Sequence, residues 1–323
     1  GYSSAASDVY KRQDLDDWII MSVNPASVTN PPAQFPEDFV FGGATAAYQV
    51  EGETRTHGKG KVAWDDFLEA QGRFSPDPAS DFYNQYPVDL ELCEEFGING
   101  IRLSIAWSRI FPNGTGEINP EGVQFYHDLF AECHKHHVEP FVTLHHFDTP
   151  LALFEKGDFL NRETIDAFVD FATFCFKEYA DQVTYWFTFN EPIVEPEQRY
   201  QEGVWFPQLH DFSRARTVQY HISLAHALAV ANYRRAYDEG AIRADAKIGM
   251  INCFTPVYTK QNPSEADLEA VRMTSGINNR WWLDLITKGE LPADVLDSLA
   301  EGGVKLPFRA GDQEILKQGC LLY

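Results

Sequence analysis

Short apolar runs alternate with longer amphipathic segments along most of the chain. Five runs are rich in β-branched and aromatic residues, which predicts buried strands. They span residues 39–44, 100–105, 139–144, 183–187 and 247–253. Pro192 cannot sit inside a central strand, so the fourth strand is expected to stop at Glu191. The long connections between these runs imply parallel strands joined by right-handed crossovers.

The connections between the predicted strands show helical periodicity. Residues 81–96 predict a helix with Val88, Leu92, Cys93 and Phe96 at helical spacing. Further helices are expected at about 120–137, 161–179 and 211–239, with two or three more within 263–317. In the helix at 161–179 the apolar residues lie on one face, and Asn161 or Arg162 stands at the capping position. The face comprises Ile165, Phe168, Val169, Ala172 and Phe176.

Strand–helix alternation of this kind predicts an α/β fold, a (β/α)8 TIM barrel, of which about five of the eight units are present. We expect residues 35–318 to form this partial barrel, roughly two-thirds of a domain. Residues 1–34 lack periodicity, and both 1–13 and 319–323 look like translated adapter sequence. A disordered tail and a genuine C-terminus are the alternative interpretation of those ends.

Composition and charge make some binding partners and cellular locations less favourable than others. The chain has 323 residues and a formal net charge of −22, which disfavours nucleic acid and anionic membranes. No apolar run is long enough to span a bilayer, and no secretory signal is visible. The 5 cysteines are scattered and form no CxxC pair, so free thiols and a cytoplasmic location are expected.

Polar residues gather where the predicted strands end. Gln49 follows the first strand, Arg102 lies on the second, His146 follows the third, and Asn190 and Glu191 close the fourth. Loops after parallel barrel strands meet at one rim, so these groups are expected to converge. Four aromatic residues are expected near them, and two further charged residues, Glu51 and Arg109, join the same rim. The aromatic residues are Trp64, Trp107, Phe147 and Trp186.

Amides, imidazole and carboxylate among aromatic rings suit a neutral, polyhydroxylated ligand. A carboxyl beside an amide is also what glycoside hydrolysis requires, together with a second carboxylate. The residues alone leave other interpretations open: a polar strand end that caps a loop, or a metal cluster at His145, His146 and Asp148. His134, His136 and His137 fit a helix C-terminus better than a metal site. We expect no metal and no organic cofactor.

Four motifs then resemble glycoside hydrolase family 1: FGGATAAYQVEG at 41–52, RLSIAWSRI at 102–110, TLHHFDTP at 143–150 and TFNEP at 188–192. The resemblance covers about residues 35–318. Further segments resemble the bacterial 6-phospho-β-galactosidases and 6-phospho-β-glucosidases, and Phe147 stands where many β-glucosidases carry Trp. These segments are VAWD at 62–65, ASDFY at 79–83, AECHK at 131–135 and GDFLNR at 157–162.

The resemblance implies roles for single residues. Glu191 is expected to be the general acid/base and Asn190 to bind the sugar 2-hydroxyl. Gln49 and His146 are expected to bind other hydroxyls, and Arg102 to support the nucleophile. The family's nucleophile, a second Glu, and its phosphate-binding cluster have no counterpart in this sequence.

The expected function is therefore that of a retaining glycosidase that cleaves 6-phospho-β-D-galactosides or 6-phospho-β-D-glucosides, with a phosphorylated disaccharide or an aryl β-glycoside as its substrate. A β-glucosidase or β-galactosidase for unphosphorylated substrates and a non-catalytic sugar-binding protein are the alternatives. The 323-residue chain itself is expected to be inactive and to fold poorly, because an open sheet exposes edges and apolar faces. The galacto or gluco preference and the oligomeric state stay open.

Overall fold

The computed structural model describes residues 34–72 and 75–322, and the chain divides into two units, 1–39 and 40–323. In the first unit the described residues form a turn, in which the Phe39 N–H donates to the Pro36 carbonyl at 3.1 Å. The rings of Phe35 and Phe39 lie 4.4 Å apart. The segment 1–34, expected to be foreign or disordered, lies outside the described residues except for Gln34.

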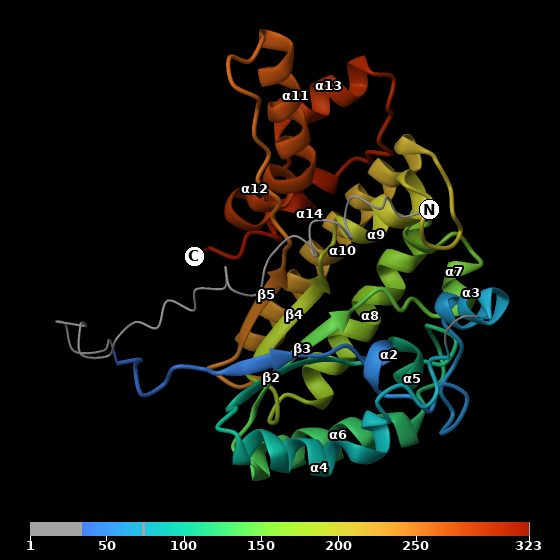
Figure 1. The fold of residues 1–323 in the computed structure, drawn as a ribbon, viewed down its shortest axis with the longest axis vertical. Helices are drawn as coiled ribbons and strands as arrows, with labels where there is room; N and C mark the ends of the chain where they lie inside the picture. Colours follow the sequence, from blue (N-terminus) through green and yellow to red (C-terminus); the bar gives the residue numbers. More distant parts are fainter. Residues whose placement is uncertain (1–33, 73–74, 323) are drawn as a thin grey trace, which may run out of the picture. The chain divides into compact units, whose positions relative to one another are not determined.

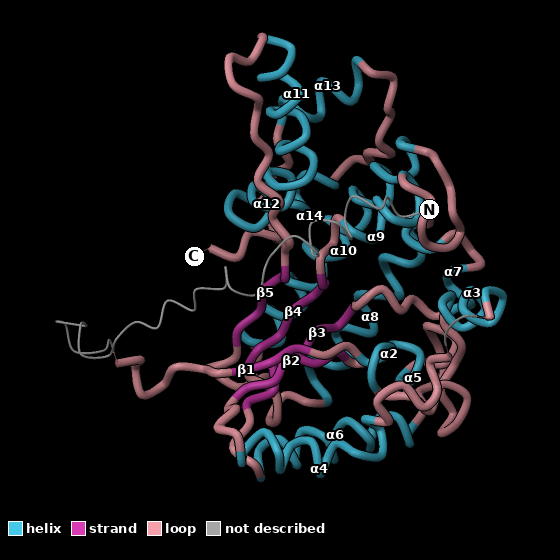
Figure 2. The backbone as a smooth tube through the Cα atoms, viewed as in Figure 1, coloured by secondary structure: helices cyan, strands magenta, loops and turns pink. Residues whose placement is uncertain are grey.

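The second unit is built on a parallel sheet of five strands in the order β1-β2-β3-β4-β5 (Figure 1, Figure 2). The strands are β1 Gly42–Ala44, β2 Gly100–Ser104, β3 Glu139–His145, β4 Tyr185–Asn190 and β5 Lys247–Ile251. Spatial order follows chain order, and every neighbouring pair is parallel. The carboxyl ends of all five strands therefore lie on the same side of the sheet, here called its carboxyl edge. This arrangement confirms the predicted α/β class with five strand–helix units.

Helices follow each strand, and four long ones lie along the sheet (Figure 1). The long helices are α4 Phe82–Glu95, α6 Pro120–Lys135, α8 Arg162–Glu178 and α10 Phe212–Asp238. The others are α2 Ala47–Val50, α3 Ala63–Gln71, α5 Trp107–Ile110, α7 Leu151–Phe154, α9 Val194–Pro196, α11 Glu265–Ser275, α12 Trp281–Lys288, α13 Ala293–Glu301 and α14 Asp312–Lys317. None of the described helices is both long and apolar enough to cross a membrane.

Helix α8 confirms the clearest helical prediction. The Asn161 side chain caps it by accepting the Glu163 N–H at 3.0 Å. Ile165, Phe168 and Phe176 are buried as predicted, and the Phe176 ring lies 5.2 Å from that of Trp186 on β4. This apolar face therefore holds α8 against the sheet.

The apolar face predicted for α4 is wrong in part. Val88, Leu92 and Phe96 are 52%, 43% and 75% exposed. The helix is instead held by its other side, where Leu90 is buried and the Tyr86 ring lies 5.9 Å from Phe125 of α6. Of the predicted face only Cys93 packs against the core, whereas the other three apolar residues stay exposed.

The first strand is shorter than predicted. It was expected over 39–44, whereas β1 begins at Gly42. The Phe41 N–H bonds the side chain of Asn99 at 2.7 Å instead of a strand partner, and the Phe41 carbonyl accepts the Asn99 N–H. Among the described residues β1 pairs only with β2 and β5 only with β4, so both edges of the sheet are open.

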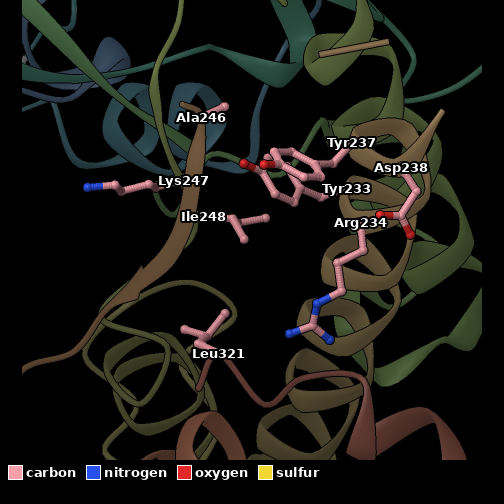
Figure 3. Close-up of a pocket in the computed structure, with 8 residues that line it drawn as sticks. All are labelled: Tyr233, Arg234, Tyr237, Asp238, Ala246, Lys247, Ile248 and Leu321. Atoms are coloured by element: carbon pink, nitrogen blue, oxygen red, sulfur yellow. The ribbon is translucent and has the colours of Figure 1, made fainter. Parts of the chain in front are cut away.

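A groove of about 600 Å³ runs beside the β5 edge (Figure 3). Tyr233 and Tyr237 of α10 point toward Ile248 of β5, and Leu321 lies at one end. The Leu321 N–H donates to the Ile286 carbonyl at 2.7 Å. A foreign origin of residues 319–323 stays a prediction.

The exposed face of α4 predicts self-association. Replacing Val88, Leu92 and Phe96 together by Ser should lower the aggregated fraction severalfold, because the face no longer offers apolar area to a second molecule. Light scattering after gel filtration measures this fraction. The control is Leu268→Ser, since Leu268 on α11 is also exposed (53%) but lies outside this face. A wild-type chain that is monodisperse at high concentration would contradict the prediction.

Candidate active site

A side-chain hydrogen bond joins the middle of β2 to the end of β4. Arg102 of β2 donates through Nη1 to Oδ1 of Asn190, the last residue of β4, at 2.5 Å. Burial lowers the pKa of Arg102, and the negative charge of Glu191 opposes that shift. The guanidinium therefore lies beside both Asn190 and Glu191, as the prediction of a shared rim requires.

Glu191 sits in a turn with a restricted backbone. Its φ is +44°, in the left-handed region that non-glycine residues seldom adopt. Its N–H donates to the Ile251 carbonyl of β5 at 2.7 Å, and its carbonyl accepts the Val194 N–H at 2.9 Å. These bonds fix the backbone where Pro192 ends the strand, while the side chain remains partly exposed.

His146 presents an uncharged imidazole. The residue is 9% exposed, and its Nδ1 has no hydrogen-bond partner. Burial lowers the pKa of His146 to about 3, helped by the nearby positive charges of Arg102 and His145. A neutral ring has one donor and one acceptor nitrogen, which suits a ligand hydroxyl.

Gln49 and His146 line one pocket of about 410 Å³. Its other lining residues are Tyr48, Trp64, Leu68, Ser75, Pro76, Ala79, Phe147 and Trp205. The Trp205 ring lies 5.0 Å from Trp64 and 5.1 Å from Phe147. An amide and an imidazole among aromatic planes are what a pyranose ring needs.

One hydrogen bond, a shared pocket and charge effects relate the five predicted site residues. Gln49 and His146 line the same pocket, and the charge of Arg102 acts on His146. Arg102 in turn bonds Asn190 and faces Glu191. Among the described residues, neither a hydrogen bond nor an ion pair joins Gln49 directly to Asn190 or Glu191.

Two of the four aromatic residues expected near the site, Trp107 and Trp186, lie away from it. Trp107 is fully buried and its ring stacks on Phe171 of α8 at 5.3 Å. Trp186 is buried against Phe176. Both belong to the layer between sheet and helices. Trp205 was missed because it lies in an irregular loop, and only its position shortly after TFNEP could have suggested it.

Glu51 and Arg109 are also not available to a ligand. They form a buried ion pair with Arg109 Nη2 2.9 Å from Glu51 Oε2, and Arg109 is 0% exposed. The Tyr126 hydroxyl donates to the other Glu51 oxygen at 2.8 Å. This network ties the loop after β1 to the segment after β2, so its role is structural.

The metal interpretation of the histidines finds little geometric support. His145 Nε2 lies 3.1 Å from the Thr149 hydroxyl, and Nδ1 lies 3.8 Å from Glu195. His136 lies between Glu94 and Glu132 at 2.8 and 3.1 Å. Across residues 34–72 and 75–322, no group of three or more His, Cys, Asp or Glu is placed to hold a metal ion.

Comparison with known proteins also indicates a glycoside hydrolase, the class of protein that the site suits. Residues 31–321 match the family described as "Glycosyl hydrolase family 1". A 6-phospho-beta-galactosidase of Staphylococcus aureus (strain MRSA252) is 49% identical over 286 residues, which are 87% of this chain. The chain belongs to glycosyl hydrolase family 1, and the resemblance of its four motifs is confirmed.

Solved structures agree with the fold. The virulence factor SghA from Agrobacterium tumefaciens superposes with a TM-score of 0.80 at 33% identity, covering 88% of this chain and 62% of that one. The psychrophilic beta-glucosidase BglU from Micrococcus antarcticus gives a TM-score of 0.79 at 34% identity, with 88% and 60% covered. The chain spans 59% of the length of the Staphylococcus aureus relative.

The depressed pKa of His146 predicts acid sensitivity. Because folding favours the neutral ring, its contribution to stability is complete above the unfolded pKa of about 6.5 and is lost as pH falls toward about 3. His146→Gln should flatten the dependence of unfolding free energy on pH in that window by up to about 1.4 kcal/mol per pH unit. Denaturant titrations at several pH values measure the slope. An unchanged slope would contradict a buried neutral His146.

Proposed function

We propose that this chain carries the proton-donor half of a retaining glycoside hydrolase for 6-phospho-β-D-galactosides or 6-phospho-β-D-glucosides. The observation that carries the proposal is the contact of Arg102 with Asn190 beside Glu191, at the carboxyl edge of the sheet. The 49% identity to a 6-phospho-beta-galactosidase supports the substrate class. Such an enzyme would act in the catabolism of disaccharide phosphates in the cytoplasm.

Each residue then has a role. Glu191 protonates the leaving oxygen and later deprotonates the attacking water. Asn190 donates to the sugar 2-hydroxyl through its amide nitrogen, because its Oδ1 is occupied by Arg102. Gln49 and the neutral His146 bind further hydroxyls. Arg102 places a positive charge where the nucleophilic carboxylate would stand.

The second carboxylate is proposed to lie in the part of the whole protein that this chain does not contain. Residues 35–318 would be the first five units of a (β/α)8 catalytic barrel, and the open edges at β1 and β5 would be its joining surfaces. The net charge of −22 opposes a phosphorylated substrate at long range. A local basic site for the phosphate would therefore be needed in the remaining part.

We predict that the 323-residue chain has no turnover. Without a nucleophile, protonation by Glu191 alone does not give the covalent intermediate of a retaining mechanism. The assay is release of nitrophenol from o-nitrophenyl 6-phospho-β-D-galactoside, with an equal amount of Glu191→Gln as the blank. Release above that blank by the wild-type chain would contradict the prediction.

In the whole protein, Glu191→Gln should lower kcat/KM by about 10²–10⁴ for an alkyl 6-phospho-glycoside. The loss should be much smaller for a 2,4-dinitrophenyl glycoside, because that leaving group departs without a proton. Steady-state rates on both substrates measure the difference. Equal losses on the two leaving groups would contradict general acid catalysis by Glu191.

An enzyme for unphosphorylated β-glycosides is the second candidate, since one solved relative is a beta-glucosidase. The ratio of kcat/KM for o-nitrophenyl β-galactosides with and without the 6-phosphate decides between the two. A non-catalytic sugar-binding protein would bind both compounds and turn over neither.

A further inference from the structure

The turn that carries His146 contains a strained residue. Phe147 has φ +67°, which is unusual for a bulky side chain. Such strain persists only where surrounding contacts hold the backbone in place. Two side chains donate to the Phe147 carbonyl: Trp64 Nε1 at 2.7 Å and Arg199 Nη2 at 3.0 Å.

Arg199 reaches this carbonyl from behind the pocket. It is 1% exposed and does not line the cavity. Its Nη1 donates to the Phe206 carbonyl at 2.7 Å, next to Trp205, and its Nε donates to Glu195 at 2.8 Å. One planar guanidinium therefore joins the turn after β3, the loop that bears Trp205, and helix α9.

The same group packs against the pocket's aromatic wall. The Arg199 guanidinium lies 5.3 Å from the Trp64 ring and 5.0 Å from the Phe154 ring. Glu195, also 1% exposed, compensates its charge. A buried guanidinium with donors fixed on three partners resists displacement, so the carbonyls that it binds are fixed as well.

We infer that Arg199 is a positioning residue that holds the His146–Phe147 turn and the Trp64–Trp205 wall in the shape that receives the sugar ring. It acts through the Phe147 and Phe206 carbonyls and does not touch the ligand. The inference rests on the proposed role of His146 in sugar binding. It adds a requirement for a planar, multidentate cation at position 199.

Arg199→Lys is the informative change. Lysine keeps a positive charge near Glu195, but a single ammonium cannot reach Glu195 and both carbonyls at once. The turn should relax and expose the His146 ring to water. The positive charge of Arg102 acting on that ring remains unchanged, and His145, whose pKa burial lowers to about 4, is mostly neutral at pH 5.

The matched control is Arg216→Lys. Arg216 on α10 is also fully buried and donates to Gln201 at 2.9 Å, but in the described part of the chain it makes no hydrogen bond or ion pair with the turn at 146–148. Both variants should lose stability, which thermal unfolding measures. Of these two variants, only Arg199→Lys should change the exposure and the charge state of the His146 ring.

The first readout is the charge state of the His146 ring in the whole protein at pH 5, followed by NMR and assigned with His146→Gln. Wild type and Arg216→Lys should show a neutral ring, whereas Arg199→Lys should show a mostly protonated one, near the ordinary pKa of about 6.5. Trp64→Phe, which removes the other donor to the same carbonyl, should also raise the protonated fraction of His146. A ring that stays neutral in both Arg199→Lys and Trp64→Phe overturns the inference, as does an equal change in Arg216→Lys.

The second readout is binding of methyl 6-phospho-β-D-galactoside, followed by the same spectra. Arg199→Lys should weaken it about tenfold, or about 1.4 kcal/mol, and Arg216→Lys should leave it unchanged. Equal affinity in wild type and Arg199→Lys overturns the inference. If the whole protein with Arg199 intact binds no phosphorylated or plain galactoside, the proposed substrate class fails, while the state of His146 still decides the role of Arg199.

Discussion

Parallel pairing of the strands in chain order is the constraint on which the site depends. The registers run Arg102↔Phe141 between β2 and β3 and Phe141↔Tyr185 between β3 and β4. They bring the end of each strand to one edge of the sheet. A slip of one residue in β2 would turn Arg102 to the opposite face and break its bond to Asn190. The arrangement of the site residues therefore depends on the strand register as well as on which residues the strands carry.

Buried charged pairs stand behind this edge and fix the loops that bear the site. Glu51 and Arg109 join the segments after β1 and β2, while Glu195 and Arg199 join α9 to the turn after β3. Removing one partner from such a pair leaves an uncompensated charge and costs several kcal/mol. The pairs thus give the irregular loops a defined geometry, and His146 can stay neutral and directed at a hydroxylated ligand.

Much of the fold and the proton-donor side of the site could be predicted from the sequence. The strand that ends at Asn190 and the helix capped by Asn161 were found because periodicity and proline are local signals. The exposure of Phe96 could not be found, since periodicity shows which face is apolar and not what covers it.

The supporting residues behind the site were harder to find. Arg199 carries no pattern of its own. Its partners Glu195 and Phe206 lie close to it in the chain, whereas Phe147 is 52 positions away. Trp186 was assigned to the rim, but alternation along a strand buried on both faces does not show which side a residue takes. Contacts between distant loops are fixed by tertiary packing, which a single sequence does not record.

The central claim is that Glu191 and Asn190 form half of a retaining two-carboxylate site. Proton NMR of the sugar released by the whole protein from a 6-phospho-β-galactoside tests it most directly, because the first anomer formed reports the mechanism before mutarotation. A retaining site should release the β-anomer first. Initial release of the α-anomer would contradict it.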